Sequence, residues 1–362
     1  MEKLIWRSQV KPYPLDSDHW LRAEAELQRM NICPKMDVHF GGATMKSFLK
    51  WFGALSLVVM LSSCGSSDDD LGNVAEVAQK NGFTALLAAV DKAGIASTLT
   101  AANADLTVLA PTDAAFGALA TQLGFANAGA MVAALPAADL AKILRYHVIP
   151  GARSSAALST AGATLPTAYV FDGAAARLAL NTSSGVAFTD AALATASVTT
   201  ANVYADNGII HGIDKVLIPP GVLNVVQMAQ ANPASFSSLV AAVVATGLAP
   251  ALSASGPFTV FAPNNAAFAS APTGLTRPQL TSVLTYHVLP AQVLSTAIPF
   301  GTPVATLATT ALDGSTVPAQ TITINRNLTI TDTTAVPATI LATDVRASNG
   351  VIHVIGKVLI PK

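Results

Sequence analysis

The stretch TVLAPTDAAF at residues 107–116 returns later in the chain as TVFAPNNAAF at residues 259–268. Two more stretches recur in the same order. RYHVIPG at 145–151 returns as TYHVLPA at 285–291, and NGIIHGIDKVLIPP at 207–220 returns as NGVIHVIGKVLIPK at 349–362. Three motifs repeated in one order indicate two copies of one unit. The spacing between copies far exceeds that of a solenoid repeat, which predicts two tandem globular domains.

The repeated motifs also suggest where the domains begin and end. We expect the first domain at residues 71–220 and the second at residues 221–362, joined by the short linker Pro219-Pro220-Gly221. The first copy has about 12 more residues than the second between its first two motifs. The extra residues fall within 117–138, an alanine-rich segment that we expect to form an additional helix and loop.

The hydrophobic period changes within each copy. In the first part of a copy, apolar residues such as Val74, Val77 and Ala78 recur at helical spacing. In the second part, segments rich in Thr, Val and Ile alternate as strands do. These segments are 177–180, 197–204, 321–325 and 328–331. Helices followed by strands predict an α+β fold.

The repeated TVLAP motif is typical of a buried strand that ends at a proline. Thr112 or Asp113 would then cap the helix that follows, as Asn264 or Asn265 would in the second copy. The motif lacks the glycines and the lysine of a phosphate-binding loop, so we do not expect it to bind anions.

An Asn-Gly pair precedes the last apolar run of each copy, at 207–208 and 349–350. This pair favours a type I′ hairpin turn, in which two successive residues have positive φ. The pattern predicts central strands at 209–211 and 215–218 in the first copy. The corresponding strands of the second copy would be 351–353 and 357–360.

Composition excludes several classes of protein. The chain has 362 residues, of which 51% are hydrophobic and 11% charged. No apolar run reaches the roughly 20 residues that span a bilayer, which excludes a multi-pass membrane protein. A net charge of -1 without basic clusters gives no basis for binding nucleic acid. Two cysteines are too few for a disulfide framework or a four-thiolate zinc site.

Residues 45–64, MKSFLKWFGALSLVVMLSSC, combine a basic start, an apolar stretch and small residues before Cys64. The stretch resembles a bacterial lipoprotein signal peptide, and the alternative is a short buried helix. The resemblance implies that residues 45–63 are removed and that Cys64 is acylated and inserts into a lipid bilayer. Translation would then start at Met45, making residues 1–44 a mis-called start or a disordered extension.

Residues 64–70 would form a polar tether after the lipid. Asp68-Asp69-Asp70 is either a solvated linker or, by its resemblance to the acidic export signal of bacterial surface lipoproteins, a sorting sequence. We therefore expect a lipid-anchored protein of the bacterial cell envelope, in the outer membrane and exposed at the surface.

Four histidines fall within the repeated motifs: His147, His211, His287 and His353. No two of them have the i, i+4 spacing of a helical metal site, and no H-E-x-x-H motif is present. The pattern favours imidazoles that are partly buried and hydrogen-bonded to the backbone. Ligand contact is the alternative. We expect no metal and no cofactor.

The sequence gives no catalytic constellation. It has no G-x-S-x-G motif, and Asp113 of the first copy is replaced by Asn265 in the second. A general base would be lost by that change, whereas a helix cap would be kept. The prediction is that the protein is not an enzyme, although a triad assembled across the fold stays an open alternative.

The three repeated motifs resemble those of the fasciclin family. TVLAPTDAAF and TVFAPNNAAF are similar to its first segment, the Tyr-His pairs to its YH motif, and the NGIIHGIDKVLIP and NGVIHVIGKVLIP stretches to its second segment. The resemblance covers residues 71–362, with one set of motifs in each copy. It implies two tandem fasciclin-like domains, each a wedge-shaped β-sandwich with helices packed along one side.

The same resemblance implies an extracellular binding role, in cell adhesion or matrix interaction. It nominates Tyr146, His147, Tyr286 and His287 as an interaction motif or a structural motif. The integrin partners of animal relatives do not transfer to a bacterial lipoprotein, so the partner is an unidentified surface, matrix protein or glycan. The alternative function is an envelope hydrolase or a small-ligand-binding protein. It would be recognisable by a deep polar pocket in one copy only, which we would expect in the first.

Overall fold

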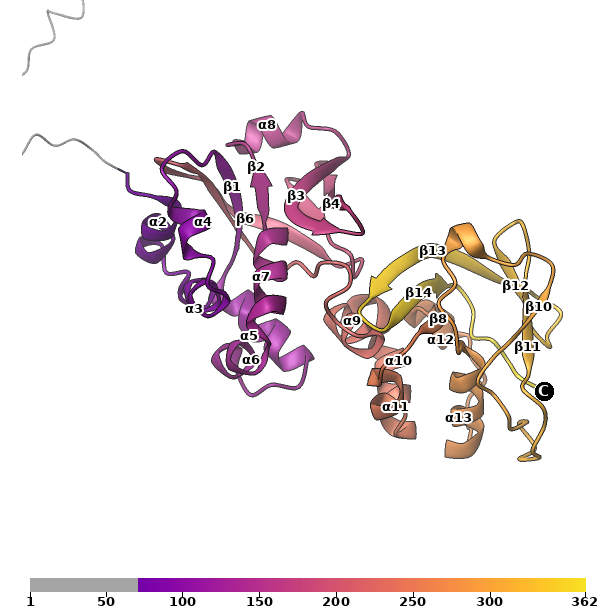
Figure 1. Cartoon of the computed structure of the whole chain (residues 1–362). Coiled ribbons are helices and arrows are strands. Elements are labelled where there is room, and N and C mark those ends of the chain that lie inside the picture. Colours follow the sequence, from indigo (N-terminus) through magenta and orange to yellow (C-terminus); the bar gives the residue numbers. More distant parts are fainter. Residues whose placement is uncertain (1–70) are drawn as a thin grey trace, which may run out of the picture. The chain divides into compact units, whose positions relative to one another are not determined.

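The structure is a computed structural model that describes residues 71–362 (Figure 1). The predictions made for residues 1–70, including the lipidation of Cys64, lie outside the described residues. Within residues 71–362, no helix is both long enough and apolar enough to cross a membrane.

The first copy begins with helices and ends with strands. Its elements are α2 (Val74–Lys80), α3 (Thr84–Ala93), α4 (Ala96–Thr100), β1 (Leu106–Pro111), α5 (Asp113–Gln122), α6 (Ala128–Ala134), α7 (Ala137–Tyr146), β2 (Val148–Pro150), α8 (Ser155–Ser159), β3 (Thr164–Phe171), β4 (Ala174–Asn181), β5 (Ala187–Thr189), β6 (Thr195–Ala205) and β7 (Gly208–Ile213). The additional helix expected within 117–138 is α6.

The second copy repeats this order without a counterpart of α6, and η1 takes the place of α8. Its elements are α9 (Val225–Ala231), α10 (Pro233–Thr246), α11 (Ala249–Ser253), β8 (Phe258–Pro263), α12 (Asn265–Ala269), α13 (Arg277–Tyr286), β9 (Val288–Leu289), η1 (Ser295–Ala297), β10 (Pro303–Ala305), β11 (Thr321–Ile324), β12 (Thr329–Thr331), β13 (Ala338–Ala347) and β14 (Gly350–Ile355).

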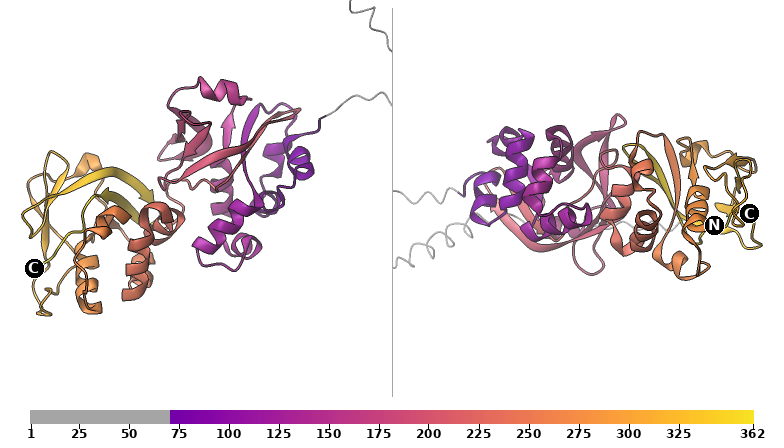
Figure 2. Two further views of the ribbon diagram at one scale, coloured as in Figure 1. Left: turned by 180° about the vertical axis from the view of Figure 1, so that it is seen from behind. Right: turned by 90° about the horizontal axis from the view of Figure 1, so that it is seen from below.

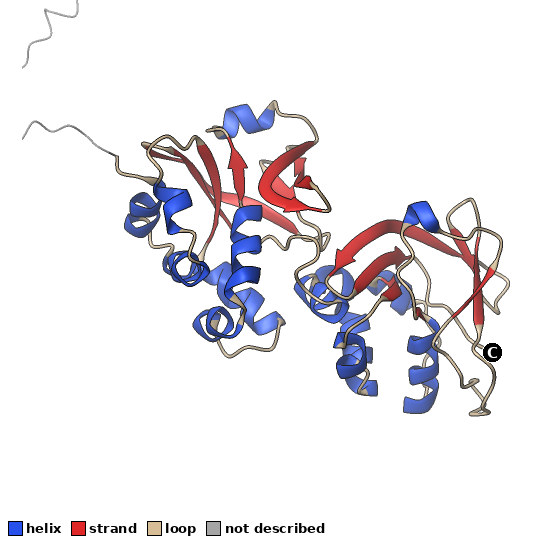
Figure 3. Cartoon of the chain, in the orientation of Figure 1, coloured by secondary structure: helices blue, strands red, loops and turns tan. Residues whose placement is uncertain are grey.

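Each copy builds one seven-stranded sheet. The strand orders are β2-β1-β7-β6-β5-β4-β3 and β10-β11-β12-β13-β14-β8-β9. Only β1 with β7 and β8 with β14 pair in parallel, and the other pairs are antiparallel. Most helices lie together on one side of the strands in each half, whereas the short α8 and η1 lie apart from them (Figure 3), and the same grouping is visible from behind (Figure 2). The α+β prediction is confirmed.

The long strand β6 connects two layers of the first copy. It pairs with β5 at one end and β7 at the other, and two register shifts interrupt its pairing with β7. Such bulges bend a strand and increase its twist. Strands β2 and β3, at opposite ends of the strand order, come into contact, so the sheet folds over on itself. Leu109, Phe188 and Ile213 are fully buried in the cluster it encloses.

The hairpins predicted at the Asn-Gly pairs are present, since Ala205 pairs with Gly208 and Ala347 with Gly350 across two-residue turns. Their predicted type I′ conformation is wrong, because neither residue of either pair has positive φ. Asn207 is buried instead, where its side chain accepts from the backbone N–H of Val74 and donates to the carbonyls of Leu99 and Ala101. A Cβ on Gly208 would overlap the carbonyl oxygen of Leu106 in the neighbouring strand. The pair therefore ties strand β7 to the helices.

The prediction of strands at 215–218 and 357–360 is also wrong. These segments have no strand partner in the sheets, although Val216, Leu217 and Ile218 are buried. Their backbone N–H groups bond to side chains instead, as described below. Strands were correctly predicted at 177–180, 197–204, 321–325 and 328–331, where β4, β6, β11 and β12 lie.

All four residues proposed as helix caps have a defined contact. Thr112 caps α5 and Asn264 caps α12, each through its side-chain oxygen. Asp113 instead accepts from the backbone N–H of Ala85 at the start of α3. Asn265 accepts from the backbone N–H of Ser238 in α10, so the change from Asp to Asn preserves the contact between two helices.

Candidate functional site

The Tyr-His pairs stand where a helix ends and a short strand begins. Tyr146 is the last residue of α7 and His147 precedes β2, while Tyr286 and His287 hold the same places in α13 and before β9. All four side chains are buried. Residues at these positions have almost no surface for direct contact with a macromolecule. Their burial supports the structural interpretation of the motif, which stays a prediction.

Each of these histidines joins a helix to the end of its domain. The Nδ1 atom of His147 lies 2.7 Å from the carbonyl oxygen of Ile143, and its Nε2 atom accepts from the N–H of Leu217 at 2.9 Å. His287 makes the same two bonds, with Val283 at 2.7 Å and Leu359 at 2.9 Å. A carbonyl needs a donor, so these contacts place the proton on Nδ1 and leave Nε2 to accept.

Burial keeps these imidazoles neutral. It lowers the pKa of His147 and of His287 to about 4, because the interior disfavours the charged form more than the carbonyl contact favours it. A protonated imidazole would also lose the lone pair that accepts from the terminal segment. The histidines are therefore neutral structural groups at neutral pH.

A buried aspartate fastens the same terminal segment in each copy. Asp190 accepts from the N–H groups of Ala192, Ala194 and Ile218, the last at 2.8 Å. Asp332 occupies the equivalent place in the second copy, where it accepts from the N–H of Ile360 at 2.9 Å. These bonds replace the strand pairing that the terminal segments lack.

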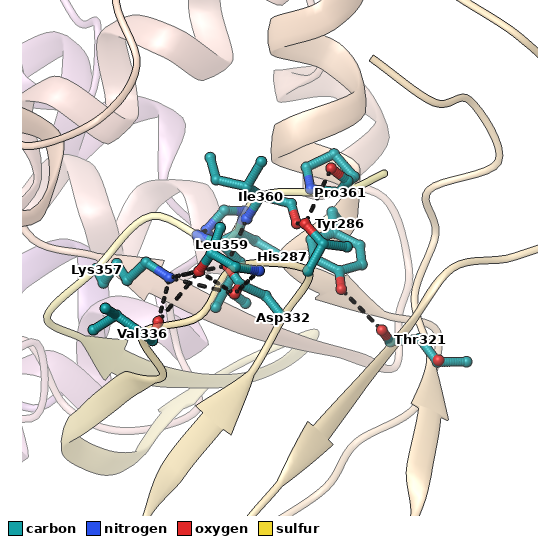
Figure 4. A network of polar contacts seen from close by, with 11 residues as sticks. Tyr286, His287, Thr321, Asp332, Val336, Lys357, Leu359, Ile360 and Pro361 are labelled. Carbon is teal, nitrogen blue, oxygen red and sulfur yellow. Dashed lines mark hydrogen bonds and ion pairs between the residues drawn. The ribbon is translucent and has the colours of Figure 1, made fainter. Parts of the chain in front are cut away.

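The second copy adds a cation to this network (Figure 4). The Nζ atom of Lys357 lies 3.2 Å from Asp332 and donates to the carbonyl of Val336 and the hydroxyl of Thr334. Burial alone would raise the pKa of Asp332, but hydrogen bonds from Thr334, Ile360 and Lys357 hold it below its usual value. In the first copy, burial raises the pKa of Asp190 to about 7, against the effect of its three backbone donors.

The tyrosines complete the connection between helix and sheet. The hydroxyl of Tyr286 donates to the carbonyl of Thr321 at 2.8 Å (Figure 4), and that of Tyr146 donates to Arg177 at 3.1 Å. Burial raises the pKa of Tyr286 to about 12 and shifts that of Tyr146 upward as well. Both phenols are therefore neutral hydrogen-bond donors.

The remaining two histidines stabilise the bulges in β6 and β13. The Nε2 atom of His211 lies 2.8 Å from the carbonyl oxygen of Arg153. Its Nδ1 atom accepts from the N–H of Asn202, whose φ is 60°. His353 makes equivalent bonds with Val293 and Asp344, whose φ is also 60°. Burial lowers the pKa of both imidazoles.

These side chains do not form a metal centre within residues 71–362. No three His, Cys, Asp or Glu side chains come close enough together in this part of the chain to hold an ion. The motif residues hold the fold together through hydrogen bonds to backbone groups, so the arrangement offers neither an exposed nucleophile nor a free general base.

A polar hollow of about 600 Å³ lies beside the turn between β13 and β14. Ser253, Ser255 and Ser348 line it, together with the ion pair between Arg346 and Asp172, whose atoms lie 3.0 Å apart. The hollow is formed mainly by the second copy, whereas the alternative function placed such a pocket in the first. Its lining can form hydrogen bonds, but it brings no acid–base pair together for catalysis.

Sequence analysis missed the structural asparagines and aspartates. Asn207 and Asn349 were assigned to turns, and Asp190 and Asp332 were not singled out. All four stand at equivalent positions of the two copies. Comparison of the copies outside the three motifs could have found the aspartates, because few acidic residues recur at the same spacing.

Comparisons with known proteins agree with the duplicated fold. A family model described as "Fasciclin domain" matches residues 81–219 and again residues 234–361. "Protein sll1483" of Synechocystis sp. (strain ATCC 27184 / PCC 6803 / Kazusa) is 41% identical over 147 residues, which cover 38% of this chain and 74% of that protein.

Two animal proteins are also similar over part of their length. "Transforming growth factor-beta-induced protein ig-h3" of Oryctolagus cuniculus is 35% identical over 44% of this chain, and "Periostin" of Homo sapiens is 31% identical over 44%. The matched regions span only 22% and 18% of those proteins. Among solved structures, a domain pair from the insect cell adhesion molecule Fasciclin I aligns with 78% of this chain and 94% of its own, at 18% identity and a TM-score of 0.38.

Proposed function

The chain belongs to the fasciclin domain family. From this membership and from the lipoprotein-like stretch at residues 45–64, we propose that it is a lipid-anchored, extracytoplasmic binding protein. Fasciclin domains are found in cell adhesion proteins, which supports an adhesion-like function. The finer proposal is that this chain acts at the bacterial cell surface, by adhesion to cells or to matrix. The non-enzymatic role is part of the same proposal.

One observation carries the proposal: the chain contains two complete copies of the same domain. Each copy keeps its own Tyr-His pair, buried aspartate and terminal segment. In neither copy are these structural groups replaced by catalytic residues. Two weak binding sites on one chain raise the apparent affinity for a surface, because the second contact forms at high effective concentration.

Anchoring is tested at Cys64. A single acyl chain binds a membrane weakly, whereas two or more hold a protein firmly. Replacing Cys64 by Ala should release the protein from membranes and abolish incorporation of labelled palmitate, while Cys33→Ala should change neither. A Cys64→Ala protein that stays in the membrane fraction and begins at Met1 would contradict the anchoring proposal.

Binding is tested with lipid-free protein starting at residue 65. This protein is applied to arrays of envelope glycans, to matrix proteins and to intact cells, and retention is measured by fluorescence. We expect saturable retention by at least one of these surfaces. Retention by none of them, together with turnover of a small ester or glycoside, would contradict the adhesion proposal and favour an envelope hydrolase.

A further inference from the structure

The polar hollow beside the turn between β13 and β14 is lined by side chains that the fold does not use. Its volume of about 600 Å³ falls in the range of small-molecule sites. Ser253, Ser255, Gln292 and Ser348 line it, and all four residues are exposed. Within residues 71–362, their side chains take part in no hydrogen bond. Three hydroxyl groups and one amide are therefore available to a ligand in one place.

Arg346, near the end of β13, adds a cation to the lining of the hollow. Its guanidinium carbon lies 5.2 Å from the centre of the Phe171 ring, and its Nη2 atom lies 3.0 Å from the carboxylate of Asp172. The Nε atom is buried, which leaves the Nη atoms to meet a ligand. The side chain of Asp172 is 60% exposed. An ion pair with so exposed a partner is weak, so a carboxylate from a ligand could take the place of Asp172.

The first copy has two carboxylates at the corresponding corner. Asp105 and Asp206 each accept from a backbone N–H group, at 2.7 and 2.9 Å. The pairing of β1 with β7 and of β8 with β14 places Pro257 and Ser348 at the equivalent positions of the second copy. Both of these residues line the hollow. The second copy therefore lacks two acidic groups that accept hydrogen bonds in the first.

The missing carboxylates leave a backbone donor without an acceptor. Asp105 binds the N–H of Ala152, and the residue equivalent to Ala152 in the second copy is Gln292. Within residues 71–362, the N–H of Gln292 has no acceptor. In addition, Arg346 stands where the first copy has Tyr204. The corner is thus acidic in the first copy and contains an arginine in the second, which favours an anionic ligand at the second.

We propose that this hollow binds an acidic glycan, with a sugar carboxylate on Arg346 and sugar hydroxyls on the three serines and Gln292. A carboxylate fits because the guanidinium already pairs with one, that of Asp172, and because its planar fork matches a carboxylate. Sugar hydroxyls both donate and accept, as do the serine hydroxyls and the glutamine amide. The bound carboxylate would displace Asp172 from Arg346.

The proposal rests on the proposed binding function, since it names a ligand class and a site for it. The probes are trimers of galacturonate, mannuronate and glucuronate. The methyl ester of each trimer is the matched probe, because it keeps the hydroxyls and lacks the charge. Isothermal titration calorimetry on the lipid-free chain from residue 65 measures binding at low salt. We expect at least one trimer to bind saturably, at one site per chain, and its ester to bind about tenfold or more weakly.

Two variants test the role of the arginine. Arg346→Gln removes the cation and should weaken binding of the acid by about tenfold or more. Asp172→Asn removes the carboxylate that competes for Arg346, so the acid should bind more tightly to this variant. If Asp172 only positions Arg346, its replacement would weaken binding instead. Circular dichroism establishes that the variants are folded.

A third variant restores an acidic group of the first copy. Ser348→Asp places a carboxylate in the lining of the hollow and should weaken binding of the acid by about tenfold or more, because like charges repel. Ser184→Asp is the matched control, since Ser184 is also exposed but lies in the turn between β4 and β5, outside the hollow. Its affinity for the acid should be unchanged.

Four results would overturn the proposal: no binding of any acidic trimer, equal binding of acid and ester, weaker binding to Asp172→Asn, and equal weakening by Ser184→Asp. Competition by inorganic phosphate at the concentration of the trimer would also overturn it, because the site would then recognise a bare anion. Any of these failures with continued retention on the arrays would leave the proposed function intact. Binding of a trimer without retention on any surface would refute adhesion and keep the site.

Discussion

At the scale of single residues, His147 and His287 connect three parts of their domains. Each accepts from the backbone of the terminal segment and donates to the preceding helix, while standing next to a buried tyrosine. The sequence predicted that these histidines are partly buried and hydrogen-bonded, because their spacing is not that of a metal site. The acceptor carbonyl lies only four residues before each histidine, but the donor N–H could not be predicted, because it belongs to a residue about 70 positions away in the sequence.

Replacing either histidine by Ala should lower the free energy of unfolding by about 1–3 kcal/mol, because the N–H of Leu217 or Leu359 is left buried without an acceptor. Urea denaturation measures the change. His287→Gln is the matched control, since an amide offers both a donor and an acceptor. If His287→Ala is as stable as the unmodified protein, or if one tightly bound zinc per domain is found by elemental analysis, the structural role is refuted.

The same histidine predicts a pH dependence. The unfolded chain binds a proton at His287 near pH 6.5, whereas the folded protein does so only near pH 4. Between these values the unfolded state binds more protons at His287, so the contribution of His287 to stability must fall as the pH falls from about 7 to 4. The loss attributable to His287 is up to about 3 kcal/mol.

Comparison with His287→Gln isolates this contribution, because other titrating groups, including Asp190, are present in both proteins. The unmodified protein should lose more stability on acidification than the variant. Parallel stability curves from pH 7 to pH 4 would show that His287 is not held neutral by the fold.

At the scale of elements, the hydrophobic period predicted the helices and most strands, because the apolar residues of those elements recur with the period of a helix or a strand. It failed for 215–218 and 357–360, which are as apolar as strands but are held by His and Asp side chains from elsewhere in the domain. The Asn-Gly pairs correctly predicted hairpin turns but not their conformation. Tertiary hydrogen bonds of Asn207 and Asn349, which the local sequence does not reveal, decide that conformation.

The glycine of each pair is required by strand spacing, not by positive φ. A Cβ at position 350 would overlap the carbonyl oxygen of Phe258 in β8. Gly350→Ala should therefore force β14 and β8 apart and lower the free energy of unfolding by about 1–3 kcal/mol, as overpacking does. Gly314→Ala is a control with open space around it but with a φ of 85°. A smaller loss at position 350 than at position 314 would contradict this explanation.

At the scale of the whole molecule, duplication was the most informative property of the sequence. Three motif pairs predicted two domains, and the change of hydrophobic period within each copy predicted the α+β fold. The division at residue 220 stays a prediction, because residues 71–362 belong to one compact unit. The partner of the protein could not be predicted, because the recurring residues are buried and serve the fold.

We expect residues 71–220 and residues 221–362 to fold when expressed separately, since each contains its own sheet and its own enclosed hydrophobic cluster. A third cluster includes residues of both halves, so each half should unfold at a lower temperature than the tandem. Calorimetry and circular dichroism provide the test. Two insoluble halves with a soluble tandem would instead indicate a shared core.

The most direct test of the binding function compares the tandem with its halves on one surface. Surface plasmon resonance measures the apparent dissociation constants of residues 65–362, 71–220 and 221–362 on a surface that retains the lipid-free protein. Two sites on one chain should make the tandem bind about 10²-fold or more tightly than either half. A tandem that binds no better than its better half, while turning over a small substrate, would contradict the account.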